Sequence, residues 1–89
     1  MVYLITYDLN GPGKDYSRLY TALQQYDNIR DPGLDSVWFV STTSTANEVS
    51  NHIRQYMDAN DKHVVTLMRA GEHQGWLLQN VWDWINARL

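Results

Sequence analysis

The chain has 89 residues, a formal net charge of −3 and 44% hydrophobic residues, which suits one small folded domain over residues 1–89 and excludes a disordered chain. It contains no cysteine, so disulfides, thiolate zinc sites and cysteine nucleophiles are excluded. No apolar run reaches the length of a membrane span and no leader pattern opens the chain, so we expect a cytoplasmic protein without membrane contact. The acidic net charge counts against strong nucleic-acid binding.

The N-terminal part of the chain predicts a strand followed by a helix. Residues 2–8 are mostly β-branched or aromatic and are followed by a Gly-Pro-Gly loop, which indicates a strand. Apolar residues within 16–26 recur at helical spacing and form one stripe, so we expect a helix there. Asp15, just before the stripe, is the expected N-cap.

The middle of the chain predicts two more strands and a second helix. The turn sequence at 31–33, Asp-Pro-Gly, separates a short strand at 28–30 from a longer one at 34–41. Thr45 and Glu48 have the spacing of a capping box, in which each side chain accepts a backbone hydrogen bond from the other residue. A helix should therefore begin directly after Thr45.

The last third predicts a strand and a C-terminal extension. Residues 58–61 have turn composition, and residues 63–68 are strand-forming. The extension, residues 70–89, contains a short helical stripe. The stripe consists of Leu78, Val81, Trp82, Ile85 and Leu89.

This order of elements predicts an α+β fold, a ferredoxin-like βαββαβ sandwich with the C-terminal extension added. Two helices cover one face of such a sheet, and the other face usually has polar side chains. Here both faces of the strand at 2–8 are apolar. The extension, a partner subunit, or both must cover the second face, and we expect a homodimer because closed twofold pairs are the commonest oligomers.

Asp8 is a candidate functional residue, because a carboxylate at the end of an apolar strand lies where metal ligands and acid/base groups often occur. The alternative is an Asx-type turn, in which its carboxylate accepts the backbone N–H of Asn10. Both interpretations stay open from the sequence. The residues that follow do not form a phosphate-binding loop, because Asp8 stands where that motif needs its first glycine and Asp15 where it needs a hydroxyl.

The C-terminal extension also contains aromatic residues that the core does not require. Four tryptophans in 89 residues is a high number. Trp82 belongs to the helical stripe, whereas Trp76 precedes it and Trp84 lies at its flank. Core packing, an anchor between subunits and base stacking are the alternatives for these side chains. His73 is a lone loop histidine, which is more often incidental than catalytic.

Two stretches, LITYDLN at 4–10 and LDSVWFV at 34–40, together with the ferredoxin-like order, resemble the CRISPR-associated protein 2 family and its VapD-like toxin relatives. The chain is particularly similar to the small stand-alone SinR-like members, and the resemblance covers nearly its whole length. Residues 10–14 differ from the acidic and arginine-rich stretch of the family. This difference and the acidic net charge count against duplex DNA as a ligand.

The resemblance implies a homodimer with a metal site. In that family an aspartate matched by Asp8 lies opposite its symmetry mate, and metal-dependent nuclease activity has been attributed to the pair in some members. Asp8 would then bind Mg²⁺, because two close carboxylates repel unless a proton or a hard cation lies between them. Ser36 would contact the metal shell or a phosphate as a second catalytic residue, and Arg18 or Arg30 would position the backbone of RNA or DNA.

A second function is also implied by the resemblance. Other members of the family are non-catalytic dimeric scaffolds, so the chain is alternatively an interaction module, either an adaptor or one half of a toxin and antitoxin pair. The mixed surface charge and the unassigned Trp76 and Trp84 favour a protein partner. A basic rim around Asp8 would instead favour the nuclease.

Overall fold

The computed structural model describes residues 1–89. Strand β1 (Val2–Asp8) is followed by helix α1 (Ser17–Gln24), strands β2 (Asp27–Ile29) and β3 (Val37–Ser41), helix α2 (Ala46–Arg54), strand β4 (Lys62–Met68) and helix α3 (Gln79–Arg88). None of the three helices combines the length and the apolar character that crossing a membrane requires.

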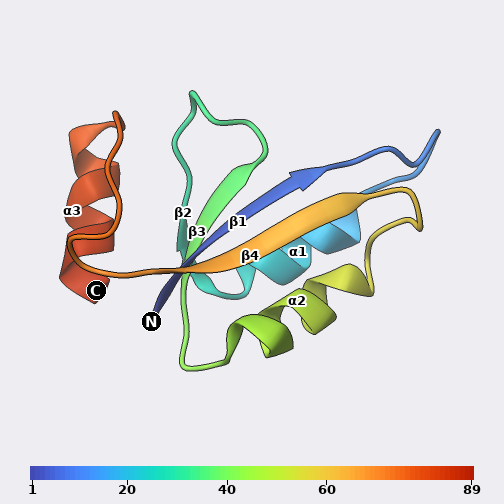
Figure 1. The fold of residues 1–89 in the computed structure, drawn as a ribbon. Coiled ribbons are helices and arrows are strands. Elements are labelled where there is room, and N and C mark those ends of the chain that lie inside the picture. The colour runs from blue at the N-terminus through green and yellow to red at the C-terminus, as the bar shows by residue number, and fades with distance from the viewer.

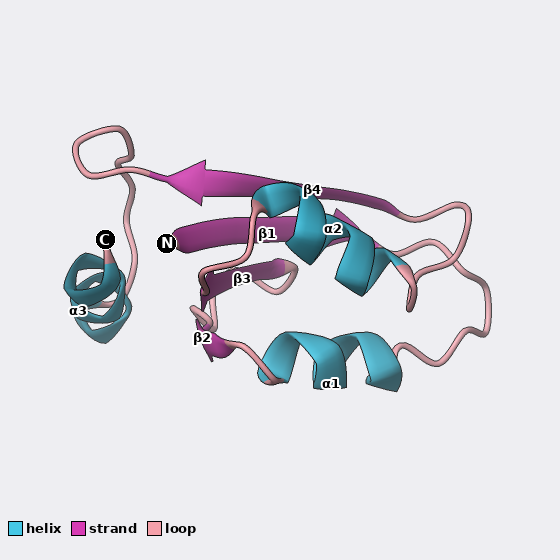
Figure 2. Ribbon diagram, turned by 90° about the horizontal axis from the view of Figure 1, so that it is seen from below, coloured by secondary structure: helices cyan, strands magenta, loops and turns pink.

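The strands form one antiparallel sheet in the order β2-β3-β1-β4. Helices α1 and α2 lie together against one face of this sheet (Figures 1 and 2). The βαββαβ order confirms the predicted α+β, ferredoxin-like fold. Helix α3 lies apart from the other two helices, near the N-terminus (Figure 2).

The main core lies between the sheet and the helix pair. Alternate residues of β1 point toward the helices, as the period of two in a strand requires. The Trp38 indole is buried in this core, and its Nε1–H donates to the Tyr7 hydroxyl at 3.0 Å. The buried members are Tyr3, Ile5, Tyr7, Leu19, Leu23, Trp38, Val40, Val49, Ile53 and Met57.

The C-terminal extension covers one half of the second sheet face. Val81 and Ile85 of α3 are fully buried against Val2 of β1 and Phe39 of β3. Toward the other end of the same face Val64 of β4 remains 55% exposed. The two-sided apolar strand therefore does indicate a second layer, and the chain's own extension supplies half of it.

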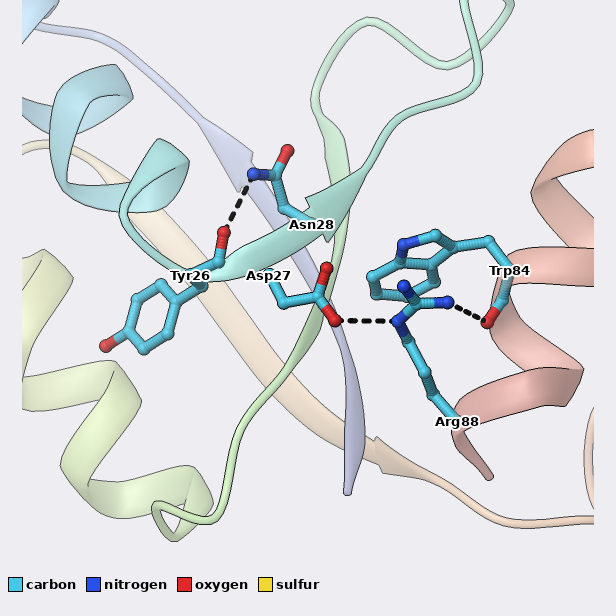
Figure 3. A network of polar contacts seen from close by, with 5 residues as sticks. All are labelled: Tyr26, Asp27, Asn28, Trp84 and Arg88. Atoms are coloured by element: carbon cyan, nitrogen blue, oxygen red, sulfur yellow. Dashed lines mark hydrogen bonds and ion pairs between the residues drawn. The ribbon is translucent and has the colours of Figure 1, made fainter.

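Two polar contacts attach α3 to the β2 region. The Asp31 carboxylate accepts the backbone N–H of Leu78 at 2.9 Å, so a residue distant in sequence caps this helix. The N–H groups of Leu78 and Gly33 hold the pKa of Asp31 below its usual value. At the other end of α3, Arg88 forms an ion pair with Asp27 at 2.7 Å (Figure 3).

The helix starts agree with the predictions to within one or two residues. The capping box at α2 is confirmed, since Glu48 N–H donates to Thr45 Oγ1 at 3.1 Å and Thr45 N–H to Glu48 Oε1 at 3.0 Å. Asp15 is not the N-cap of α1, because Tyr16 occupies that position. The Asp15 carboxylate nevertheless accepts the N–H of Ser17 at 2.9 Å.

The third strand is shorter than predicted, because β3 begins at Val37 and not at Leu34. Two successive turns hold the intervening residues. Leu34 N–H donates to the Asp31 carbonyl at 2.9 Å, and Val37 N–H donates to the Leu34 carbonyl at 3.2 Å. These local bonds replace the ladder contacts that a strand would need.

Candidate active site at the end of β1

A groove of about 470 Å³ opens where β1 ends, between α1 and the loop that joins β2 to β3. Asp8, Ser36 and Arg30 all line it. Asp8 ends β1, whereas Arg30 and Ser36 lie in the β2–β3 loop; the family resemblance implied a site of Asp8, Ser36 and either Arg18 or Arg30. The full lining of this Asp8 groove is Tyr7, Asp8, Leu9, Tyr20, Arg30, Asp35 and Ser36.

Backbone and stacking contacts position two residues of the groove, Ser36 and Arg30. The Ser36 carbonyl accepts the N–H of Tyr7 at 3.3 Å, which holds Ser36 beside the end of β1. The Arg30 guanidinium lies over the Trp38 ring, 4.4 Å from its centroid, and donates to the carbonyl of Asp35. Arg30 is therefore held in place before any ligand binds.

The Asp8 carboxylate is exposed and does not stabilise the following turn. Its Oδ2 accepts one long hydrogen bond, from the Asn10 side-chain amide at 3.3 Å. The backbone N–H of Asn10 donates instead to Asp61 Oδ1 at 2.5 Å. The Asx-turn interpretation of Asp8 is wrong for this reason, because another carboxylate has taken that role.

Asp61 holds the loop that follows Asp8. Its side chain is buried, with 2% exposure, and accepts the N–H groups of Asn10 and Asp58 together with the Tyr16 hydroxyl at 2.8 Å. Tyr16 Oη in turn accepts the N–H of Gly11 at 2.9 Å. A Cβ at Gly11 would lie 2.7 Å from that hydroxyl and 3.0 Å from the Asp58 Cβ, so a larger residue would force these groups to move.

Hydrogen bonding keeps Asp61 ionised. Burial by itself raises the pKa of the carboxyl group, but the N–H groups of Asn10 and Asp58, the Tyr16 hydroxyl and the nearby Arg54 charge outweigh it. The net pKa of Asp61 therefore lies below its usual value. A charged acceptor at this position ties the β1–α1 loop to the α2–β4 loop.

The groove is lined by both acidic and hydrogen-bond-donating residues. Asp8 and Asp35 provide carboxylates, and Arg30 provides a guanidinium. Partial burial raises the pKa of the Tyr20 phenol, with the nearby Tyr7 adding to the increase, so Tyr20 remains a hydrogen-bond donor at neutral pH. Asp8 also borders a second hollow of about 240 Å³ that includes Lys62, its partner in the sheet register.

The structure does not bring Arg18 to this groove. Arg18 borders a separate hollow formed by α1 and Tyr56. The Arg54 guanidinium donates to the Asp61 carbonyl at 2.8 Å, and Arg88 pairs with Asp27. The basic residues that line hollows containing Asp8 are Arg30 in one hollow and Lys62 in the other.

Four residues that line the groove had no functional role in the prediction from sequence: Tyr7, Leu9, Tyr20 and Asp35. Asp35 directly precedes Ser36, so its position beside a candidate site residue was an available signal. Tyr20 belongs to the apolar stripe of α1, which indicated the core, yet it is 36% exposed and lines the groove.

The donor set suits a hard cation that retains other ligands. No group of three or more histidine, cysteine, aspartate or glutamate side chains is placed to hold a metal ion. Asp8, Asp35 and Ser36 do line one groove, and Mg²⁺ binds through one or two carboxylates while keeping water and substrate phosphate ligands. These residues therefore fit Mg²⁺ better than they fit zinc.

No known protein family matches this chain, and no solved structure gives a significant match. The groove and its residues are therefore the basis for inferring what the protein does.

Proposed function

We propose that the chain forms a homodimer similar to the CRISPR-associated protein 2 family and cleaves phosphodiester bonds of RNA or DNA with a divalent metal ion at Asp8. The observation that carries this proposal is the meeting of Asp8, Ser36 and Arg30 in one groove. Phosphodiester cleavage uses a metal-binding carboxylate, a hydrogen-bond donor and a positive charge beside the phosphate. Here the Asp8 carboxylate is exposed, and Asp61 accepts the Asn10 N–H in its place. The Arg30 guanidinium is held by the Asp35 carbonyl.

Each side chain has a role that follows from its chemistry. Asp8 supplies negatively charged oxygens that bind the metal ion. Ser36 donates its hydroxyl hydrogen to a phosphate oxygen, and Arg30 offers its remaining N–H groups to the same phosphate. When bound, Mg²⁺ supplies Lewis-acid activation of the phosphate and of a water molecule.

A second copy would complete the ligand set. One chain places two carboxylates, Asp8 and Asp35, at the groove. The open half of the second sheet face adjoins Asp8, which pairs with Lys62 across β1 and β4. Packing of two such faces about a twofold axis would bring a second Asp8 toward the first.

Asp8→Asn is expected to lower the rate of RNA or DNA cleavage in Mg²⁺ or Mn²⁺ by at least about a hundredfold, because the amide cannot replace a charged metal ligand. Cleavage of labelled oligonucleotides is the measurement. Glu72→Gln, which removes an exposed carboxylate outside the groove, is the matched control and should retain the wild-type rate. Equal cleavage by Asp8→Asn, or none by the wild-type protein, contradicts the proposal.

The alternative function is a non-catalytic dimeric module, an adaptor or one half of a toxin and antitoxin pair. Its support is the fully exposed Trp76, with 99% exposure, since tryptophan is enriched at the centres of protein interfaces. A wild-type protein that dimerises but neither binds nor cleaves oligonucleotides decides for this alternative.

A further inference from the structure

Trp76 stands out on the surface of the molecule. It lies in the loop between β4 and α3 and is 99% exposed, more than any other large hydrophobic side chain. Leu34 and Leu78 beside it in the fold are 39% and 52% exposed. Large apolar side chains gathered on a surface mark an interaction site more often than single ones do.

The loop presents Trp76 in a fixed position. Before Trp76, the His73 Nδ1–H donates to the Arg69 carbonyl at 2.8 Å, and the His73 ring stacks on Trp82. After it, the Leu78 N–H is held by the Asp31 carboxylate. These contacts hold the backbone on both sides of Trp76 and leave its side chain projecting from the surface.

A hollow of about 320 Å³ lies directly beside Trp76, which forms part of its rim. The second sheet face forms its floor, and the β2–β3 loop and the α3 region form its walls. None of its lining residues is an acid, a lysine or an arginine. Its apolar residues other than Trp76 are Leu4, Leu34, Phe39, Met68, Leu77 and Trp82.

The chemistry of this surface favours protein over nucleic acid. A strand of nucleic acid needs lysine or arginine close to its phosphates, and the hollow has neither. The whole chain has a net charge of −3, so the acidic surfaces of two copies repel each other. Two copies therefore approach most closely through a surface that has no charged side chains. The uncharged Trp76 surface meets that condition.

A projecting anchor and a receptive hollow on the same surface are what a twofold interface requires. In such an interface residue i of one copy contacts residue j of the other, and j contacts i in return. Each inserted tryptophan side chain would bury about 200 Å² of its own surface and a similar area of the hollow that receives it. The two reciprocal contacts would therefore bury roughly 800 Å² in total. Leu34 and Leu78, both partly exposed, extend the contact toward the area of about 1,000 Å² that a specific interface needs.

We infer that Trp76 is the anchor of the homodimer, with the Trp76 side chain of each copy inserted into the Leu4–Phe39–Met68 hollow of the other. This inference rests on the dimer of the proposed function and extends its interface from the open half of the second sheet face to the hollow beside α3. Leu4 belongs to the hollow, and Thr6 and Asp8 follow it on the same face of β1. The interface therefore begins about 13 Å from Asp8 along the strand.

The first test is sedimentation of the full chain at micromolar concentration without metal or nucleic acid. The wild-type protein is expected to dimerise, and Trp76→Ser to raise the dimer dissociation constant at least about thirtyfold, as loss of an interface hot spot does. Leu89→Ser, at an exposed apolar residue that does not line the hollow, is the matched control and should change the dissociation constant much less. A wild-type monomer, or a Trp76→Ser variant that dimerises normally, overturns the inference.

A mixing experiment tests the reciprocal geometry. Leu34→Arg blocks the hollow but keeps the anchor, whereas Trp76→Ser keeps the hollow but lacks the anchor. Each variant alone should be monomeric, and their mixture should form a heterodimer through the one intact contact. Failure of the mixture to associate, when both variants are folded by circular dichroism, overturns insertion of Trp76 into this hollow.

Fluorine NMR of 5-fluorotryptophan-labelled protein separates the remaining outcomes. The Trp76 resonance should shift as the protein concentration rises. If it shifts only when single-stranded oligonucleotide is added, the surface binds nucleic acid and the inference is overturned. Cleavage assays keep the two proposals apart. A dimer that depends on Trp76 but cleaves no nucleic acid would support this inference and overturn the nuclease proposal. A dimer that does not depend on Trp76 but cleaves nucleic acid would support the nuclease and overturn this inference.

Discussion

Asp61→Ala is expected to lower the free energy of unfolding by about 3 to 5 kcal/mol, because a buried charged acceptor is removed and its donors lose their partner. The carboxylate accepts hydrogen bonds from the N–H groups of Asn10 and Asp58 and from the Tyr16 hydroxyl. For a chain of this size the loss is a large part of the total stability, which is on the order of 0.1 kcal/mol per residue. Urea denaturation followed by fluorescence and circular dichroism measures it.

The control for this prediction is Asp58→Ala in the same loop. The Asp58 carboxylate accepts one exposed hydrogen bond, from the Asn60 N–H at 3.2 Å, so its removal should cost less than about 1 kcal/mol. Equal effects of the two variants would mean that the loop tolerates the loss of Asp61, and that its carboxylate does not hold the β1–α1 loop in place.

The same contacts make the stabilisation by Asp61 depend on pH. The pKa of Asp61 is lower in the folded protein than in the unfolded chain, so the unfolded chain takes up the proton first as pH falls. The contribution of Asp61 is complete above about pH 4 and disappears as the pH falls through the folded pKa. The stability difference between wild type and Asp61→Asn should therefore be constant near neutral pH and shrink in acid, and an increase in acid would contradict this assignment.

Ile85→Ala is expected to destabilise the whole protein by about 2 to 4 kcal/mol, the cost of a cavity at a fully buried aliphatic site. Ile85 has 0% exposure and packs with Val81 against Val2 and Phe39. Because this cluster includes the central strand, α3 should unfold together with the sheet. Denaturation curves recorded by tryptophan fluorescence and by circular dichroism should coincide.

The matched control for Ile85 is the adjacent Asn86→Ala, which changes an exposed position of the same helix. It should alter the unfolding free energy by less than about 0.5 kcal/mol. A loss below about 1 kcal/mol for Ile85→Ala, or an early transition confined to the helix, would show that α3 is only weakly attached to the sheet.

The amino-acid sequence by itself determined the features that depend on neighbouring residues. The capping box of Thr45 and Glu48 closes between residues three apart, and the alternation along β1 and the apolar stripe of α3 repeat over short distances. These signals were sufficient for the α+β, ferredoxin-like order and for the need of a second layer over the sheet. The resemblance in β1 and β3 pointed further, to Asp8 and Ser36.

Only the tertiary structure decided which polar groups meet. Asp61 lay in a stretch with turn composition, yet its carboxylate holds Asn10, which is 51 residues away, and Asp31 caps α3 across 47 residues. Likewise, the position of α1 brings Tyr20 to the groove and leaves Arg18 elsewhere. The physical reason is that hydrogen bonds between distant residues depend on how all layers pack, whereas caps and periodicities form within one or two turns of the chain.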